Sequence, residues 1–523
     1  MVTDAPTPTL LTDRIEHWAR TTPDAVALIY AERTWTFGEW NRDITATAAA
    51  LRISGVGPGD SVAVLDKNHP SCLLLTFAAA TLGAANAVLN WRLSADELIY
   101  VINNSRARIL FVGPDFTDTV EAIRTELSYV ATVIVVGGER DGFEAWLAPG
   151  REQGSPVEKS NDAGRTCLLL YTSGTTGYPK GACLSHANII AHTTSVCTVF
   201  HFSSTDRNLV AMPLFHVGGS CYAMFGFHVG VPTILTREPD AAALFGALAA
   251  GATHAFLVPA VIAAIVQGGD RAIAAMRQLR YLGYGASPMP LPLLRRVLVD
   301  WPDANFIQVY GMTELSGVVT TLNPADHRDP GHPERLASAG TPIPGVEMRI
   351  VDPVTGDDVA PGEPGELWFR TAQAMTGYLD NPEATAATIT AEGWLRSGDI
   401  GQLDAGGYVS IVDRVKDMII SGGENIYSPE VERVLGEHPA VAEVAVIGVP
   451  DEQWGEAVRA IVAPYPGGVI DPAELIEFCR LHLAHYKCPR QIDVLESLPR
   501  NGTGKIMKRA LRRPFWQDRD RNV

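Results

Sequence analysis

Residues 172–181 of the chain read TSGTTGYPKG, and they follow the apolar run Cys167 to Tyr171. A predicted buried strand thus leads directly into hydroxyls, glycines and one lysine, and a helical pattern resumes near Ala187. Hydroxyl groups, glycine backbone and the ammonium of Lys180 can converge on one anion. The stretch therefore predicts a phosphate-binding loop, made by Thr172, Ser173, Gly174, Thr175, Thr176, Gly177 and Lys180.

Two other interpretations of this loop are weaker. A Walker A loop needs a glycine directly before its lysine and a Ser or Thr directly after it. Here Pro179 precedes Lys180 and Gly181 follows it, so the pattern fails at two positions. A flexible surface linker stays an alternative, although it gives no reason for a proline and a lysine between two apolar segments.

Length and charge limit the class of protein. At 523 residues, 46% of them hydrophobic, the chain is long enough for more than one domain with a large core. Its 42 Lys and Arg residues against 59 Asp and Glu residues give a formal charge of -17. This excess of acid argues against nucleic-acid binding and against adhesion to an anionic membrane.

Cysteine usage and hydropathy indicate the compartment. The seven cysteines are scattered, with no Cys-x-x-Cys pair, so neither a disulfide framework nor a zinc site is predicted. No apolar run is long enough to span a bilayer, and residues 1–11 do not resemble a signal peptide. We expect a reduced, cytoplasmic protein without an integral membrane segment, and a homodimer is one option for its assembly.

The order of predicted elements indicates an α/β fold. Strands expected at Ser61 to Leu65, Ala85 to Leu89 and Ile109 to Val112 alternate with helices at βαβ spacing, and the alternation continues to about residue 308. Turn-rich residues 350–366 predict a small β-rich subdomain. Beyond Asp413 a compact α+β module is expected. We therefore expect a large N-terminal domain, 1–412, with doubly wound mixed sheets, and a small C-terminal domain, 413–523.

Further stretches put polar residues at predicted strand ends, where open α/β sheets bind ligands. Tyr310 offers a face on which a planar base can stack, and Thr313 with Glu314 offers oxygens suited to magnesium. Each has a plainer interpretation: Thr313 and Glu314 can begin a helix, and His216 beside Phe215 can be a packing residue. The stretches are 212–219, 284–288, 308–314, 394–399, 413–425 and 499–505.

Taken in order, these motifs resemble the adenylate-forming superfamily, which includes acyl- and aryl-CoA ligases, beetle luciferases and peptide-synthetase adenylation domains. The resemblance covers nearly the whole chain. It implies that ATP and magnesium convert a carboxylic acid to an acyl adenylate, and that coenzyme A then takes the acyl group. It also implies that the C-terminal domain is mobile and rotates between the two half-reactions.

The same resemblance implies roles for individual residues. Lys505 would bridge the carboxylate and the α-phosphate, and His216 would gate the acid pocket. Lys416 would be the hinge. The phosphates would be held by Thr172 to Lys180, and the nucleotide by Tyr310, Gly311, Met312 and Thr313. Magnesium would be bound by Thr313 and Glu314, and the ribose by Asp399 and Arg414. The pantetheine arm of coenzyme A would pass beside Gly422 and Gly423.

The expected acid pocket is lined by small, apolar residues, and it has no lysine or arginine that could pair with a second carboxylate of the substrate. Its expected walls are His216, Gly218, Gly219, Val261, Tyr284, Gly285, Ala286, Val309 and Val318. A medium or long fatty chain, or a bulky polycyclic or aromatic acid, fits best. An aryl-CoA ligase, with Tyr284 or Ser287 as partner of a ring hydroxyl, stays open, as do an enzyme of one half-reaction and a non-catalytic binder.

Overall fold

A computed structural model describes residues 7–153, 158–172, 179–353, 355–414, 417–421, 424–451, 453–500 and 506–516. Several expected site residues lie outside this described part: Ser173, Gly174, Thr175, Thr176, Gly177, Lys416, Gly422, Gly423 and Lys505. Contacts group the chain into two units. Unit one is Met1–Glu347 with Arg370–Leu395, and unit two is Met348–Phe369 with Arg396–Val523.

This division differs from the boundary expected between residues 412 and 413. Residues 348–369 and 396–412, which include the expected β-rich subdomain, group with the C-terminal residues. Sequence reasoning placed the boundary at Asp413, where the pattern of elements changes to a compact α+β module. Their strands instead pair with strands that continue to Arg414, and tertiary pairing rather than composition decides the grouping.

Unit one contains a seven-stranded sheet in which the five strands from β7 to one edge are parallel, and the two strands at the other edge pair antiparallel. Near-continuous apolar runs such as SVAVL and TCLLLYT suit strands that are covered on both faces. In sheet order the strands are β18 (Gly377–Tyr378), β8 (Lys180–Ser185), β7 (Thr166–Thr172), β4 (Ala85–Val88), β3 (Ser61–Leu65), β5 (Ala107–Val112) and β6 (Thr132–Val135).

A nine-stranded sheet is the second layer of unit one. Its strands from β13 to β1 are parallel, and antiparallel strands complete both edges. In sheet order they are β15 (Thr341–Pro342), β14 (Gly317–Leu322), β13 (Asn305–Met312), β12 (Tyr281–Gly285), β11 (His254–Leu257), β9 (Asn208–Val210), β10 (Thr233–Leu235), β1 (Val26–Tyr30) and β2 (Arg33–Thr36). The predicted mixed, doubly wound sheets are confirmed.

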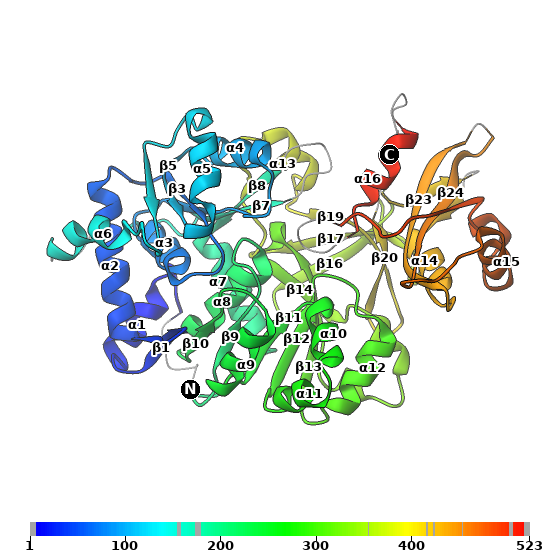
Figure 1. The fold of residues 1–523 in the computed structure, drawn as a ribbon, viewed down its shortest axis with the longest axis horizontal. Coiled ribbons are helices and arrows are strands. Elements are labelled where there is room, and N and C mark those ends of the chain that lie inside the picture. Colours follow the sequence, from blue (N-terminus) through cyan, green and yellow to red (C-terminus); the bar gives the residue numbers. More distant parts are fainter. Residues whose placement is uncertain are drawn as a thin grey trace. The chain divides into compact units, whose positions relative to one another are not determined.

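Helices pack on both sheets, and several begin at capping boxes, as at Thr36 with Glu39 and at Ser94 with Glu97. One core cluster joins α3, α7 and α8 to strands of both sheets, and Figure 1 shows α7 and α8 between the two sets of strands. The α-helices of unit one are α1 (Asp13–Thr21), α2 (Phe37–Ile53), α3 (Pro70–Thr81), α4 (Ala95–Asn104), α5 (Thr117–Ile123), α6 (Phe143–Glu152), α7 (His186–Cys197), α8 (Val217–Val229), α9 (Ala241–Ala249), α10 (Pro259–Gln267), α11 (Asp270–Met276), α12 (Leu291–Asp300) and α13 (Pro382–Thr388).

Unit two has two sheets and its own apolar core around Ile419, Val446 and Val458. The four-stranded sheet is ordered β16 (Val346–Val351), β17 (Gly365–Thr371), β19 (Leu395–Leu403) and β20 (Val409–Arg414). The five-stranded sheet contains β22 (Glu424–Ile426), β21 (Ile419–Ser421), β24 (Gly455–Pro464), β23 (Val441–Asp451) and β25 (Gln491–Val494), and the helices are α14 (Ser428–Gly436), α15 (Pro472–His482) and α16 (Lys508–Arg512).

The structure confirms the helix expected near Ala187 and adds a strand between it and the expected phosphate loop. Strands β7 and β8 form an antiparallel pair in which Thr172 faces Lys180. Helix α7 begins only after β8, at a capping box of Ser185 and Asn188. The amino end of α7 therefore does not follow the loop as the helix of a Walker A motif would. Within the described ranges, no helix combines the length and hydropathy needed to cross a bilayer.

Candidate active site

The loop that carries His216 connects β9 to α8, and it is held by a buried side chain from the loop that follows β3 of the other sheet. Asn68, 3% exposed, donates from Nδ2 to the Met212 carbonyl oxygen at 3.0 Å and accepts at Oδ1 from the Leu214 N–H at 2.8 Å. His216 itself is the N-cap of α8, and its carbonyl oxygen accepts from the N–H of Gly219 and Ser220. Sequence reasoning missed Asn68, which follows β3 by three residues.

Glu314 and Lys180 come together at a third residue, Tyr378. The buried carboxylate of Glu314 accepts a hydrogen bond of 2.6 Å from the Tyr378 hydroxyl, and Lys180 Nζ lies 5.1 Å from the centre of the Tyr378 ring. Burial and the neighbouring Glu314 carboxylate raise the pKa of Tyr378, so its hydroxyl stays protonated and donates. Tyr378 lies on β18, opposite Ala182 of β8. Its only sequence signal is an aromatic residue three positions before the helix cap Asn381.

The turn from Glu314 to Val318 is fixed by two buried polar side chains. Gln373, 1% exposed, donates from Nε2 to the carbonyl oxygens of Leu315 at 2.9 Å and Val318 at 2.6 Å. His192 Nε2 accepts from the Val318 N–H at 3.1 Å, and burial lowers the pKa of His192 to about 3, so its ring is neutral and able to accept. Thr313 and Glu314 begin the short 3₁₀ turn Thr313–Leu315, in line with the plainer interpretation, although the cap residue is Met312 and not Thr313.

Three of the expected site glycines are required by backbone packing. A Cβ atom on Gly311 would stand 1.7 Å from the Gly317 carbonyl oxygen, where β13 and β14 shift register. A Cβ on Gly219 would stand 2.1 Å from the Pro213 oxygen, and one on Gly285 2.2 Å from the Val309 oxygen. A larger residue at any of them would push apart the strands and loop that carry the candidate site.

The expected walls of the acid pocket divide between the two faces of the nine-stranded sheet. Val309 belongs to the core cluster on the α8 face, and Val318 packs against it. Tyr284 belongs to the opposite cluster, with Val261 packed beside it. The Tyr284 hydroxyl and His327 Nε2 are 2.8 Å apart, and the other ring nitrogen of His327 is bonded to the Asn323 carbonyl oxygen.

Tyr284 is therefore not the free partner for a ring hydroxyl that the sequence suggested. Strand alternation sends successive side chains to opposite faces, and Tyr284 falls on the far one. Of the remaining expected walls, Gly218 is half-buried, and Ala286 is exposed with a φ of 63°. Tyr310, Met312 and Thr313 are half-buried at the end of β13 and the turn that follows.

Unit two carries the two expected ribose ligands, which face each other across a strand pair. Asp399 of β19 is opposite Arg414 of β20, and Arg414 Nε lies 3.2 Å from Asp399 Oδ1. The Asp399 N–H donates to the Ser397 hydroxyl at 3.0 Å. Arg414, the last residue of β20, thus orients the Asp399 carboxylate, which can accept hydroxyl donors.

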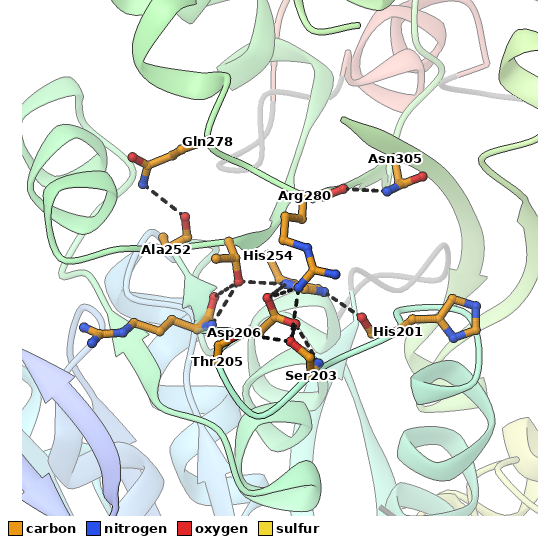
Figure 2. Close-up of polar contacts among 11 residues, drawn as sticks. His201, Ser203, Thr205, Asp206, Ala252, His254, Gln278, Arg280 and Asn305 are labelled. Atoms are coloured by element: carbon orange, nitrogen blue, oxygen red, sulfur yellow. Dashed lines mark hydrogen bonds and ion pairs between the residues drawn. The ribbon is translucent and has the colours of Figure 1, made fainter. Parts of the chain in front are cut away.

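A second polar cluster lies at the other ends of the parallel strands (Figure 2). The buried Asp206 accepts from the Ser203 N–H and hydroxyl at 2.6 and 2.8 Å and from Arg280 at 2.6 Å. The His254 ring stacks between Phe202 and Tyr281, and burial lowers its pKa to about 4. Because His254 begins β11 and Arg280 precedes β12, this cluster fastens the amino ends of the strands, away from the candidate site at their carboxyl ends.

Comparison with known proteins decides the family. The AMP-binding enzyme family matches residues 15–379, and the AMP-binding enzyme C-terminal domain matches residues 430–505. The chain belongs to the AMP-binding enzyme family. The predicted adenylate-forming resemblance is thereby confirmed.

Two curated relatives and one solved structure show the range of this family. A feruloyl-CoA synthase of Amycolatopsis sp is 38% identical over 95% of this chain and 97% of its own. A fatty acid–[acyl-carrier-protein] ligase of Streptomyces coeruleorubidus is 35% identical over 96% of this chain and 95% of its own. The o-succinylbenzoate CoA synthetase of Bacillus subtilis, solved with its acyl-adenylate intermediate, aligns with a TM-score of 0.82 at 30% identity over 95% of this chain and 97% of its own.

These findings agree with the enzyme class expected from the sequence, an AMP-forming acid–thiol ligase. ATP, magnesium and coenzyme A, the expected cofactors, are those of AMP-forming CoA ligases in this family. The acids named for the relatives are an aryl acid, a fatty acid and a succinylbenzoate, so family membership gives the reaction type without the acid.

Proposed function

We propose that this AMP-binding enzyme activates a hydrophobic monocarboxylic acid with ATP and then transfers the acyl group to coenzyme A. The observation that carries the proposal is the Lys180–Tyr378–Glu314 arrangement beside the expected phosphate loop. A cation, a buried carboxylate and a positioned hydroxyl serve nucleotidyl transfer, because such transfers depend on fixed charges around the phosphates. A scaffold that only binds would have no need to keep them.

Each part of the chain would do one task in this reaction. Thr172 to Lys180 would hold the triphosphate, Tyr310 to Met312 would bind adenine, and Asp399 with Arg414 would hold the ribose hydroxyls. Lys505 would neutralise the charge that builds up as the carboxylate attacks the α-phosphate and pyrophosphate departs. Lys416 as hinge, and Gly422 and Gly423 beside pantetheine, stay predictions from the resemblance.

The residues present fit magnesium. Glu314 supplies a buried carboxylate with Thr313 next in sequence, and hard oxygen donors of this kind suit that ion. When bound there, magnesium would shield the phosphate charge. The protein's own residues orient the Glu314 carboxylate, because the Tyr378 hydroxyl donates a hydrogen bond to it.

Two classes of acid fit the proposal. A medium or long fatty acid or a bulky polycyclic acid is the first, and the fatty acid ligase among the relatives supports it. An aryl acid of the cinnamate or benzoate type is the second, supported by the feruloyl-CoA synthase, which has the higher identity. A cytoplasmic location and a homodimer also stay proposals, carried by the sequence alone.

Replacement of Lys505 tests the proposed mechanism. We expect Lys505→Ala to lower acyl adenylate formation about a hundredfold or more, as loss of one positioned charge does, while largely sparing thioester formation from supplied acyl adenylate. The two half-reactions are measured separately, by pyrophosphate release and by mass spectrometry of acyl-CoA. The exposed Arg509 is the control, and Arg509→Ala should change either rate by about twofold at most. Equal loss of both half-reactions in Lys505→Ala would contradict the assigned role.

A further inference from the structure

The space between helix α8 and the nine-stranded sheet is bridged by one aromatic side chain, Phe256 of β11. Its Cε1 lies 2.9 Å from the point where a Cβ of Gly218 would stand, and its Cδ2 lies 3.3 Å from the corresponding point on Gly283. Gly218 is on α8, two residues after His216, and Gly283 is the strand partner of Phe256 on β12. A Cβ on Gly218 would collide with this ring, and a Cβ on Gly283 would crowd it, so both glycines make room for Phe256 between the sheet and the helix.

More aromatic rings fill the layer behind Phe256. Tyr222 lies one helical turn beyond Gly218 on the same face of α8, and its ring centre is 5.9 Å from that of Phe256. The ring centre of Phe200 is 6.0 Å from that of Tyr222, and its Cζ also lies against Gly283, 2.6 Å from the ideal Cβ position. Each of these side chains is at most 6% exposed, so the layer is closed.

The distance from this layer to the candidate site is short. Strand β12 ends at Gly285, two residues beyond Gly283, which corresponds to about 7 Å along the strand. Val309, an expected wall of the acid pocket, belongs to the same core cluster as Phe256. An acid that enters from the strand ends on this face therefore meets the Phe256 ring after roughly the length of one aromatic ring, about 7 Å.

We propose that Phe256 ends the acid pocket, and that the enzyme takes a compact acid with a single aromatic ring rather than a long-chain or polycyclic acid. A flat ring gains edge or face contacts on this aromatic layer. A long alkyl chain would have to displace buried rings that are in contact with one another. The inference rests on the proposed ligase function and selects the second of its two acid classes.

Acyl-CoA formation by the wild-type enzyme with benzoate, 4-hydroxycinnamate, octanoate, dodecanoate and palmitate is the first test. We expect kcat/KM for the best one-ring acid to exceed that for palmitate about a hundredfold or more, because each misfitting methylene costs on the order of tenfold. Equal or better use of palmitate would overturn the inference and leave the ligase function intact. No product with any acid would instead count against the proposed function.

The second test opens the pocket. Phe256→Ala should raise kcat/KM for dodecanoate about tenfold or more and lower it for the one-ring acid. The control is Phe306→Ala, since Phe306 is equally buried on β13 but packs on the opposite face with Trp301 and Tyr284. It should cost comparable stability without changing the preference for length. Phe256→Leu keeps more of the packing and should shift the preference in the same direction, and a folded variant with an unchanged preference would refute the role of Phe256.

Discussion

At the scale of single residues, Tyr378 is the side chain on which the candidate site depends most. It holds a buried carboxylate with its hydroxyl and a lysine over its ring, and neither contact is made by a neighbour in sequence. If a buried carboxylate loses its hydrogen-bond donor, the free-energy cost of removing it from water is no longer offset. Removal of the hydroxyl should therefore misplace Glu314 without disturbing Lys180, which contacts the ring.

Tyr378→Phe tests this position. We expect the rate of pyrophosphate release to fall about tenfold and the magnesium concentration needed for half-maximal rate to rise, since Glu314 is no longer oriented. Tyr171→Phe is the matched control, because Tyr171 is on β7 of the same sheet and its hydroxyl donates a comparable bond of 2.9 Å to Asn104 of α4. An unchanged magnesium dependence in Tyr378→Phe would show that Tyr378 does not position Glu314.

At the scale of elements, the candidate site is built from turns fastened to elements far away in the chain. Asn68 ties the β9–α8 connection to the end of β3, and Gln373 ties the turn after β13 to the segment before β18. Both amides are almost fully buried and bond backbone groups of the loop. Each loop thus makes two hydrogen bonds to one buried side chain, which narrows the conformations that the loop can take.

Asn68→Ala should release the His216 loop. We expect KM for the acid to rise about tenfold with KM for ATP nearly unchanged, together with a loss of about 1–3 kcal/mol of stability from the unpaired backbone groups. Asn86→Ala is the control: Asn86 is also buried and bonds Thr76 and the Cys72 carbonyl oxygen. It should lose similar stability without a selective change in KM for the acid. Parallel behaviour of the two variants would mean that Asn68 is structural only.

At the scale of the whole molecule, buried histidines make stability depend on pH. Burial is the chief cause that lowers the pKa of six of them: to about 3 for His192 and to about 4 for His69, His186, His228, His254 and His327. Each is neutral in the folded chain at a pH where the unfolded chain binds a proton. Their contribution to stability is therefore complete above about pH 6.5 and is lost as the pH falls toward 4.

Denaturant unfolding at pH 7.5, 6.0 and 5.0 checks this expectation. The free energy of unfolding should fall with pH by up to about 1.4 kcal/mol per pH unit for each such histidine. His254→Gln should reduce the slope of the free energy of unfolding against pH by the contribution of one histidine. The reason is that His254 is held between Phe202 and Tyr281 and has a lowered pKa. A free energy of unfolding that stays constant from pH 7.5 to 5.0 would rule out this account.

The sequence by itself determined the elements and the reaction type. Strand and helix positions from β3 to β5, the expected phosphate loop after β7 and the order of the polar stretches follow from local patterns, and these suffice for the family. Local patterns work here because propensity, capping and motif spacing involve residues close together in the chain. The grouping of residues 348–369 with the C-terminal part was not visible in this way, since it depends on strand pairing.

Only the tertiary structure decided which side chains meet. Glu314 and Tyr378 are 64 residues apart, and Asn68 lies 144 residues from Met212. The face on which Tyr284 lies, and the passage of Phe256 between Gly218 and Gly283, depend on strand register and helix packing. Such contacts form because two sheets close on one apolar core, and a single sequence carries no local signal of which distant residues that closure brings together.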